Sequence, residues 1–128
     1  MSQHIKVEVL RAKDLKREDG ILGKNDPYVE LSIGHTLLGG QKHKTETHKN
    51  QSGDVEFGES FTFKNVKPND ELKVKVYDDD LVSDDDIGKT KIPLDTLFES
   101  GQITQWYQIG EGSKVRGQLE LRLTVLRE

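Results

Sequence analysis

The sequence predicts an all-β fold, an eight-stranded antiparallel β-sandwich. Apolar and polar residues alternate with a period of two in segments of strand length. Turn residues separate these segments at intervals of roughly 8 to 16 residues. No stretch has the apolar spacing of a helix of about 10 residues or more. The 128 residues suit one domain, residues 1–128 with a core at about 5–126.

Two strands are expected in the first quarter of the chain. Valine, leucine and isoleucine occupy alternate positions in 5–9 and again in 28–33. The connection 11–27 is long for an ordinary hairpin. Because long loops in compact domains are usually functional, this one is a candidate binding loop.

The next two strands are expected over 41–47 and 57–63, on either side of a polar turn at 50–54. The second of them places one acidic and three aromatic side chains on one face, namely Phe57, Glu59, Phe61 and Phe63.

Four strands and one helical turn are expected in the remainder. In 72–76 the even positions are apolar and face the core. A strand over 88–93 and a helical turn at 94–98 follow. The last two strands are 103–109 and 119–125, and the last has the clearest alternation in the chain.

Composition excludes several classes of protein. The net charge is −4 and the pI is about 5.6, so the chain has no overall footprint for nucleic acid. It contains no cysteine, which removes disulfides, thiolate catalysis and thiolate metal sites. No stretch approaches the roughly 18 apolar residues of a membrane span. We therefore expect a cytoplasmic protein without a permanent anchor.

Six of the nine residues in 78–86 are aspartate and none is basic. Asp78 and Asp80 continue the even series of the preceding strand, so both carboxylates point the same way, with the Asp79 carbonyl between them and Asp86 within reach. Two carboxylates about 5 Å apart repel by roughly 3 kcal/mol at an effective dielectric near 20. Calcium, which takes about 6 to 8 hard oxygen ligands in flexible geometry, is the expected counter-ion.

The aspartates allow three other interpretations. A solvated acidic loop is the simplest. An EF-hand fails because a loop starting at Asp78 has Val82 and Ser83 where an oxygen ligand and glycine are needed. Catalysis has little support, since the chain has no G-x-S-x-G elbow, P-loop or G-x-G-x-x-G. We expect neither an enzyme nor a small-molecule substrate.

The long first loop supplies more acidic oxygens. Asp19 and Asp26 lie there among glycines, and Asp26 stands directly before a strand opened by Pro27. Proline is suited to the first position of a strand because it fixes φ and has no N–H to pair.

Four motifs stand out along the chain: Ala12-x-Asp14-Leu15, Gly23-Lys24-Asn25-Asp26-Pro27-Tyr28-Val29, Phe57-x-Glu59-x-Phe61-x-Phe63, and Val76-Tyr77-Asp78-x-Asp80 with Asp86 and Ile87-Gly88. Taken together, they resemble a C2 domain, and the likeness extends from Ile5 to Leu126. The segment 117–121 resembles the strand that comes first in the other circular permutation of the family. The resemblance therefore implies the type II topology.

The resemblance implies a site for two or three calcium ions. Carried over by position, the ligands are Asp19, Asp26, Asp78, Asp80 and Asp86, with the carbonyls of Gly20 and Asp79 as additions. The spacing from Asp19 to Asp26 is one residue longer than usual, and the glycine after Asp86 comes one residue early. Glu18, Asp84 and Asp85 are therefore alternates.

Each acidic loop also carries an aliphatic pair, Ile21 and Leu22 in the first and Leu81 and Val82 in the third. In the family such residues insert into the membrane; packing back on the sandwich is the other interpretation. Lys42, Lys44 and Lys49 resemble the family's polybasic strand and are candidates for lipid headgroups, although a solvated strand face fits them as well.

The resemblance implies a calcium-dependent phospholipid-binding module of signalling or membrane trafficking, recruited peripherally from the cytoplasm to anionic membranes. The competing interpretation is a calcium-independent protein-interaction module, whose partners are other proteins.

Overall fold

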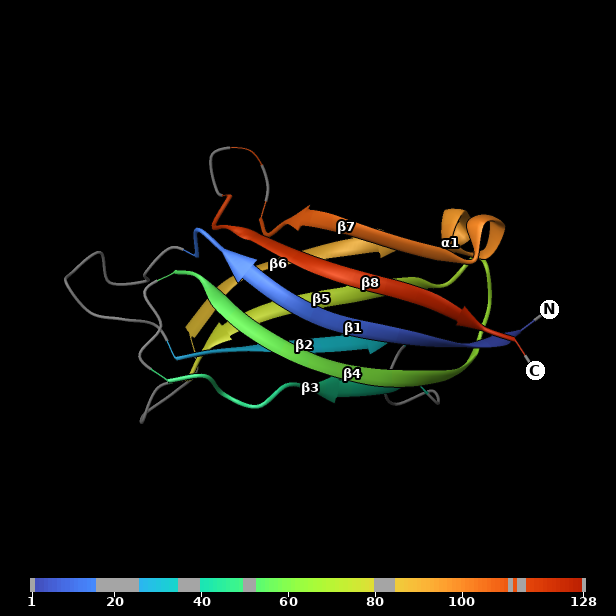
Figure 1. Cartoon of the computed structure of the whole chain (residues 1–128), viewed down its shortest axis with the longest axis horizontal. Helices are drawn as coiled ribbons and strands as arrows, with labels where there is room; N and C mark the ends of the chain where they lie inside the picture. Colours follow the sequence, from blue (N-terminus) through green and yellow to red (C-terminus); the bar gives the residue numbers. More distant parts are fainter. Residues whose placement is uncertain are drawn as a thin grey trace.

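The computed structural model describes residues 2–15, 26–34, 40–49, 53–79, 85–110, 112 and 115–127. Figure 1 shows two four-stranded sheets packed face to face, which confirms the predicted eight-stranded antiparallel sandwich. The strands and the helix are β1 (Gln3–Lys13), β2 (Pro27–Ile33), β3 (Gln41–Lys44), β4 (Val55–Val66), β5 (Glu71–Asp78), β6 (Asp85–Pro93), α1 (Asp95–Ser100), β7 (Gln102–Gln108) and β8 (Gln118–Leu126).

The first sheet has the strand order β4-β1-β8-β7 and the second has the order β3-β2-β5-β6. All six strand pairings are antiparallel. The strand that resembles the first strand of the other permutation is β8; it comes last and pairs with β1, as the type II topology requires.

The core lies between the two sheets and follows the predicted alternation. On β5, Leu72, Val74 and Val76 are fully buried, and on β8 Leu119 and Leu121 are fully buried as well. Fully burying an aliphatic side chain of this size contributes about 1.5 to 3 kcal/mol. The period of two therefore sets which face of each strand becomes core.

The strand predicted over 41–47 is shorter than expected, since β3 ends at Lys44. The reason lies in Thr45, whose hydroxyl accepts the Val29 N–H (3.0 Å) while its own N–H donates to the Val29 carbonyl (2.9 Å). The Thr45 hydroxyl thus accepts the Val29 N–H in place of a backbone carbonyl of β3, and the regular β2–β3 hydrogen-bond ladder ends there.

The strand predicted to begin at Gly88 begins three residues earlier, at Asp85. A register shift between Val76 and Tyr77 allows Tyr77 to pair with Asp86 and Asp78 to pair with Asp85. The predicted helical turn is also displaced. It forms α1 and ends at Gly101, whose φ of 86° is left-handed and whose N–H donates to the Leu97 carbonyl (2.7 Å).

The two ends of the sandwich differ. Lys13 of β1, Pro27 of β2 and Asp78 of β5 lie at one end, which we call the aspartate end (Figure 1). The first and last strands bring His4 opposite Leu126 at the other end, where both chain termini lie. In the part of the chain that the structure describes, no helix is long and apolar enough to cross a membrane.

Candidate functional site at the aspartate end

Asp26 and Asp78 are adjacent in space although 52 residues separate them in the sequence. The Asp26 N–H donates to the Asp78 carboxylate at 2.8 Å, and the Asp79 N–H donates to the Asp26 carbonyl at 2.9 Å. Pro27 pairs with Asp78 in the β2–β5 ladder. The end of the first long loop and the start of the acidic third loop are therefore held together by backbone and carboxylate hydrogen bonds.

Local sequence accounts for this arrangement. Pro27 opens β2 as expected, and Tyr28 behind it stacks on Tyr77, with ring centroids 5.2 Å apart and planes inclined by 24°. Val76 is fully buried and Asp78, two residues on, is half-buried at the rim of the core. Asp78 thus continues the inward-facing series, as the alternation predicts.

Asp86 comes to the same end through β6. It pairs with Tyr77, the residue before Asp78, and its side chain is exposed. Ile87, which follows it, is buried and fixes β6 against the core. Among the five predicted calcium ligands, Asp26, Asp78 and Asp86 are therefore brought to one end of the fold.

The segment Thr45–His48, which we call the strap, connects this end to β2, to β4 and to Asp79 just after β5. The Glu46 N–H donates to both oxygens of Glu59 on β4 (3.1 and 3.3 Å), and the His48 N–H donates to the Pro27 carbonyl (3.0 Å). The Thr47 hydroxyl donates to the Asp79 carboxylate (3.0 Å). The Asp79 side chain is therefore engaged with the strap, which leaves its backbone carbonyl as the group available to the loop.

The remaining predicted site residues lie outside the described residues. These are Glu18, Asp19, Gly20, Ile21, Leu22, Asp80, Leu81, Val82 and Asp84, together with the side chain of Asp85. Among the residues that are described, no group of three or more acidic or histidine side chains is close enough to hold a metal ion. The donors that do gather at this end are carboxylate and carbonyl oxygens, which are hard ligands of the kind that calcium takes.

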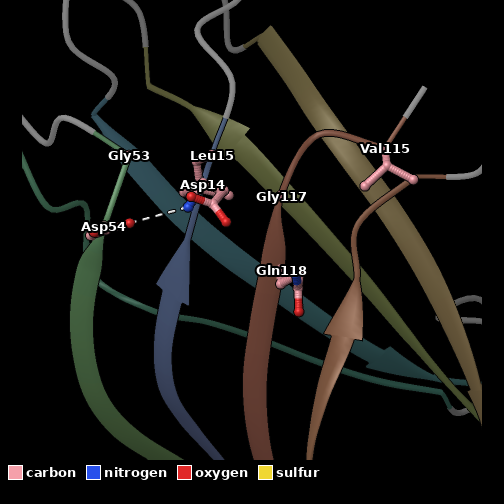
Figure 2. Close-up of a pocket in the computed structure, with 7 residues that line it drawn as sticks. All are labelled: Asp14, Leu15, Gly53, Asp54, Val115, Gly117 and Gln118. Atoms are coloured by element: carbon pink, nitrogen blue, oxygen red, sulfur yellow. Dashed lines mark hydrogen bonds between the residues drawn. The ribbon is translucent and has the colours of Figure 1, made fainter. Parts of the chain in front are cut away.

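A hollow of about 550 Å³ lies at the aspartate end beside β1 and β8 (Figure 2). The Asp14 N–H donates to the Asp54 carboxylate at 3.1 Å, and Asp14 has a left-handed φ of 57°. Gly117 packs so closely that a Cβ there would lie 3.0 Å from the Asp14 carbonyl oxygen. The Ala12-x-Asp14-Leu15 motif is thus explained by the turn that leaves β1.

Lysines form two rows across the outer face of the second sheet. The strand registers give the row Lys44, Glu30, Lys75, Lys89 and the row Lys42, Ser32, Lys73, Lys91. All six lysines are exposed except Lys75, which is half-buried. Within the rows Glu30 is the sole carboxylate, and it lies 3.7 Å from the Lys42 ammonium. We call this surface the lysine face.

Lys42 and Lys44 were predicted from the sequence as headgroup residues, whereas the four lysines on β5 and β6 were not. Their signal was present, since lysine occupies alternate positions in 73–75 and again in 89–91. The third predicted headgroup residue, Lys49, lies beyond β3 and is exposed. His43 faces inward instead, with its ring 5.4 Å from that of Phe61.

On the first sheet, two arginines form ion pairs with glutamates of neighbouring strands. Arg122 lies 2.9 Å from Glu8, and Arg11 bonds both Glu56 (3.1 Å) and Glu120. Hydrogen bonding to Glu56 raises the pKa of Arg11 above its usual value. Carboxylates therefore balance these two arginines, whereas the rows of the lysine face hold six lysines and one carboxylate.

A sequence profile of the C2 domain matches residues 3–109. Extended synaptotagmin-1 of Homo sapiens is 32% identical over 128 residues, which cover 95% of this chain and 11% of that protein. FT-interacting protein 4 of Arabidopsis thaliana is 34% identical over 127 residues, which cover 93% of this chain and 16% of that protein. The chain thus spans about a tenth to a sixth of the length of these relatives.

Solved structures show the same fold. A structure of two C2 domains of Extended-Synaptotagmin 2 matches with a TM-score of 0.83 and 25% identity, over 98% of this chain and 41% of that one. A structure of one C2 domain of plant Extended Synaptotagmin 1 matches with a TM-score of 0.80 and 24% identity, over 99% and 98%. The profile match covers most of the chain and the fold agrees with it, so the chain belongs to the C2 domain family.

Proposed function

We propose that this chain is a binding module, not an enzyme, that docks on anionic phospholipid membranes through its aspartate end in a calcium-dependent manner. The observation that carries the proposal is the link between Asp26 and Asp78, which unites two distant acidic segments. A C2 structure of Extended-Synaptotagmin 2 with a TM-score of 0.80 has been solved with calcium bound. Its 23% identity makes it a guide to fold alone.

The residues present fit a calcium site. The carboxylates of Asp26, Asp78 and Asp86 and the carbonyl of Asp79 are the described candidates, and Asp19 and Asp80 complete the set that the C2 pattern implies. Calcium, when two or three ions are bound, supplies positive charge at an end that is otherwise acidic.

The residues of the chain determine how that charge acts. The net charge of −4 disfavours approach to an anionic leaflet, whose surface potential is about −30 mV. Neutralising the aspartates removes this repulsion, and the same two acidic segments of the sequence contain the aliphatic residues Ile21, Leu22, Leu81 and Val82. Insertion of these side chains would contribute about 1.5 to 3 kcal/mol each at full burial.

The lysine face supplies a second contact. The row Lys44, Glu30, Lys75, Lys89 contains the next outward-facing pair along β2 and β5 from the stacked Tyr28 and Tyr77, so the lysine face adjoins the aspartate end. Each lysine near an anionic surface contributes about 1 kcal/mol. We propose that lipid phosphates contact this face when the aspartate end is docked, with Lys49 at its margin.

Vesicle co-sedimentation tests the proposal. The chain should pellet with phosphatidylserine-containing vesicles in calcium and stay in solution with chelator. Asp78→Asn keeps an oxygen that can accept the Asp26 N–H but removes the charge, so it should fold and lose calcium-dependent pelleting. Asp95→Asn, at the exposed start of α1, is the matched control and should behave as the wild type.

The competing function is a calcium-independent interaction module, and the lysine face favours it because its charge needs no metal. Equal pelleting in calcium and chelator, abolished by changing Lys73, Lys75, Lys89 and Lys91 to glutamine, would replace the calcium proposal with a calcium-independent membrane module. If the chain does not pellet at all and millimolar calcium leaves its melting temperature unchanged, the results would favour a module that binds proteins.

A further inference from the structure

Each sheet of the sandwich has two edge strands, whose outer N–H and C=O groups have no ladder partner. Natural sheets protect such edges with short strands, charges, proline or bulges. Three of the four edges here have such devices. β3 is four residues long and carries Lys42 and Lys44. β6 carries Lys89 and Lys91 and ends in Pro93.

The edge strand β4 is protected by charge and irregularity. It carries Glu56, Glu59 and Lys64, and its pairing with β1 shifts register between Val9 and Arg11. The fourth edge, β7, has the sequence Gln-Ile-Thr-Gln-Trp-Tyr-Gln. It has seven residues with no charge, no proline and no glycine, and it pairs in regular register with β8.

The hydrogen bonds beside β7 show which of its residues face the open side. The Ile109 N–H donates to the Gly117 carbonyl (2.9 Å) and the Gly101 carbonyl accepts the Val125 N–H (2.9 Å), so odd-numbered residues bond toward β8. The Gly110 N–H points the other way, to the Lys89 carbonyl (3.0 Å). The even residues of β7 therefore present their backbone groups to the open edge, and these are Gln102, Thr104, Trp106 and Gln108.

The inward-facing side of β7 is also incompletely covered. Ile103 and Tyr107 pack on the core but are only partly buried, and Gln105 between them is exposed. The open side of the sandwich thus combines unpaired backbone groups with partly covered apolar side chains. An added strand would form hydrogen bonds with the unpaired backbone groups and would cover the exposed parts of the apolar side chains.

We propose that β7 is a self-association edge, where the β7 strands of two copies pair antiparallel about a two-fold axis at Gln105. In this register Thr104 lies opposite Trp106 of the second copy, and Ile103 lies opposite Tyr107 of the second copy. Gln102 and Gln108 face each other at both ends. The even-numbered residues, whose backbone groups face outward, then form hydrogen-bonded pairs across the new interface. Gln105 of one copy lies opposite Gln105 of the second copy in a non-hydrogen-bonded pair.

The strand is complementary to itself, which favours a second copy as the occupant. β-Branched residues meet aromatic ones in four pairs, an arrangement that stabilises neighbouring strands. Because β7 has no charged side chain, pairing of the two strands brings no like charges together. The two first sheets would join into one sheet of order β4-β1-β8-β7-β7-β8-β1-β4. This inference is independent of calcium and lipid.

Cysteine crosslinking tests the register directly, because the chain has no cysteine. Non-hydrogen-bonded pairs have Cα atoms about 4.5 Å apart, within the range that a disulfide spans. Gln105→Cys should form disulfide-linked dimers under mild oxidation. Gln102→Cys, the same substitution in the same strand, should crosslink at least ten-fold more slowly, because its copies lie at opposite ends of the paired strands.

Sedimentation equilibrium tests association without a covalent bond. The wild-type average mass should rise with protein concentration. Gln105→Lys places two ammonium groups opposite each other and should abolish the rise, whereas Gln102→Lys, which meets Gln108, should retain it. Circular dichroism melts confirm that the variants fold. A wild type that stays monomeric, equal crosslinking at 102 and 105, or a dimer indifferent to Gln105→Lys would each overturn the proposal.

Discussion

Thr45→Val is expected to destabilise the fold through a single buried hydroxyl. Thr45 is 5% exposed and is the one buried polar side chain among the residues that the structure describes. Its hydroxyl accepts the Val29 N–H at 3.0 Å and donates to the Glu46 carbonyl at 3.0 Å. Valine keeps the branched shape but leaves the Val29 N–H without its acceptor in a site that water does not reach.

The expected magnitude follows from the desolvation of that N–H. Leaving a buried donor unsatisfied costs about 1 to 3 kcal/mol, a large part of the 5 to 15 kcal/mol that typically stabilises a domain. At about 4 °C per kcal/mol, the melting temperature should fall by about 4 to 12 °C. Thr45→Ser keeps the hydroxyl and loses one methyl group, so it should cost only about 0.8 kcal/mol.

Urea denaturation monitored by Trp106 fluorescence measures the difference. Thr45→Val should lower the midpoint at an unchanged m-value, and Thr62→Val, at an exposed position on β4, should leave the stability within about 0.5 kcal/mol of wild type. If Thr45→Val were as stable as Thr45→Ser, the hydroxyl would not be satisfying a buried donor, and the explanation for the early end of β3 would be wrong.

Three further predictions follow from the packing and the site. Gly88→Ala should cost about 1 to 3 kcal/mol in urea denaturation, because the new Cβ would lie 2.6 Å from Cγ2 of the fully buried Ile109; a neutral result would contradict this packing. Burial raises the pKa of Tyr107 above 10.0, so an ultraviolet titration should show a late-ionising tyrosine that Tyr107→Phe removes. The unfolded chain ionises first, so stability should fall as pH rises from about 10 through the raised pKa, and Tyr107→Phe should remove that loss. Finally, if the proposed calcium site is correct, Thr47→Val should weaken calcium binding in calorimetry by freeing the Asp79 carboxylate, while Thr47→Ser should preserve it; equal affinities would exclude a role for the strap.

Much of the fold could be predicted because most strands bury one face. The alternation at Leu72, Val74 and Val76 fixed which side of β5 became core, and the same alternation placed Asp78 at the rim. The end of β3 could not be predicted in this way. It depends on the Thr45 side chain reaching a backbone N–H sixteen residues away, which is a tertiary contact.

The candidate site was predictable in part. Asp26 and Asp78 were named from motifs, but their direct hydrogen bond and the role of Asp79 as a partner of Thr47 arise from strand pairing and the strap. The lysine face shows the same limit. Its four additional lysines alternate in the sequence, yet only the sheet order β3-β2-β5-β6 brings them into rows with Lys42 and Lys44.

The termini have a practical consequence for attaching the molecule to anything else. Gln3 and Leu126 lie at the far end from Asp26, separated from it by about the length of the nine-residue β8, which is roughly 30 Å. A fluorophore, bead or fused polypeptide coupled through either terminus would therefore lie at the end of the sandwich opposite the aspartate end. The aspartate end would remain unobstructed on an immobilised sensor.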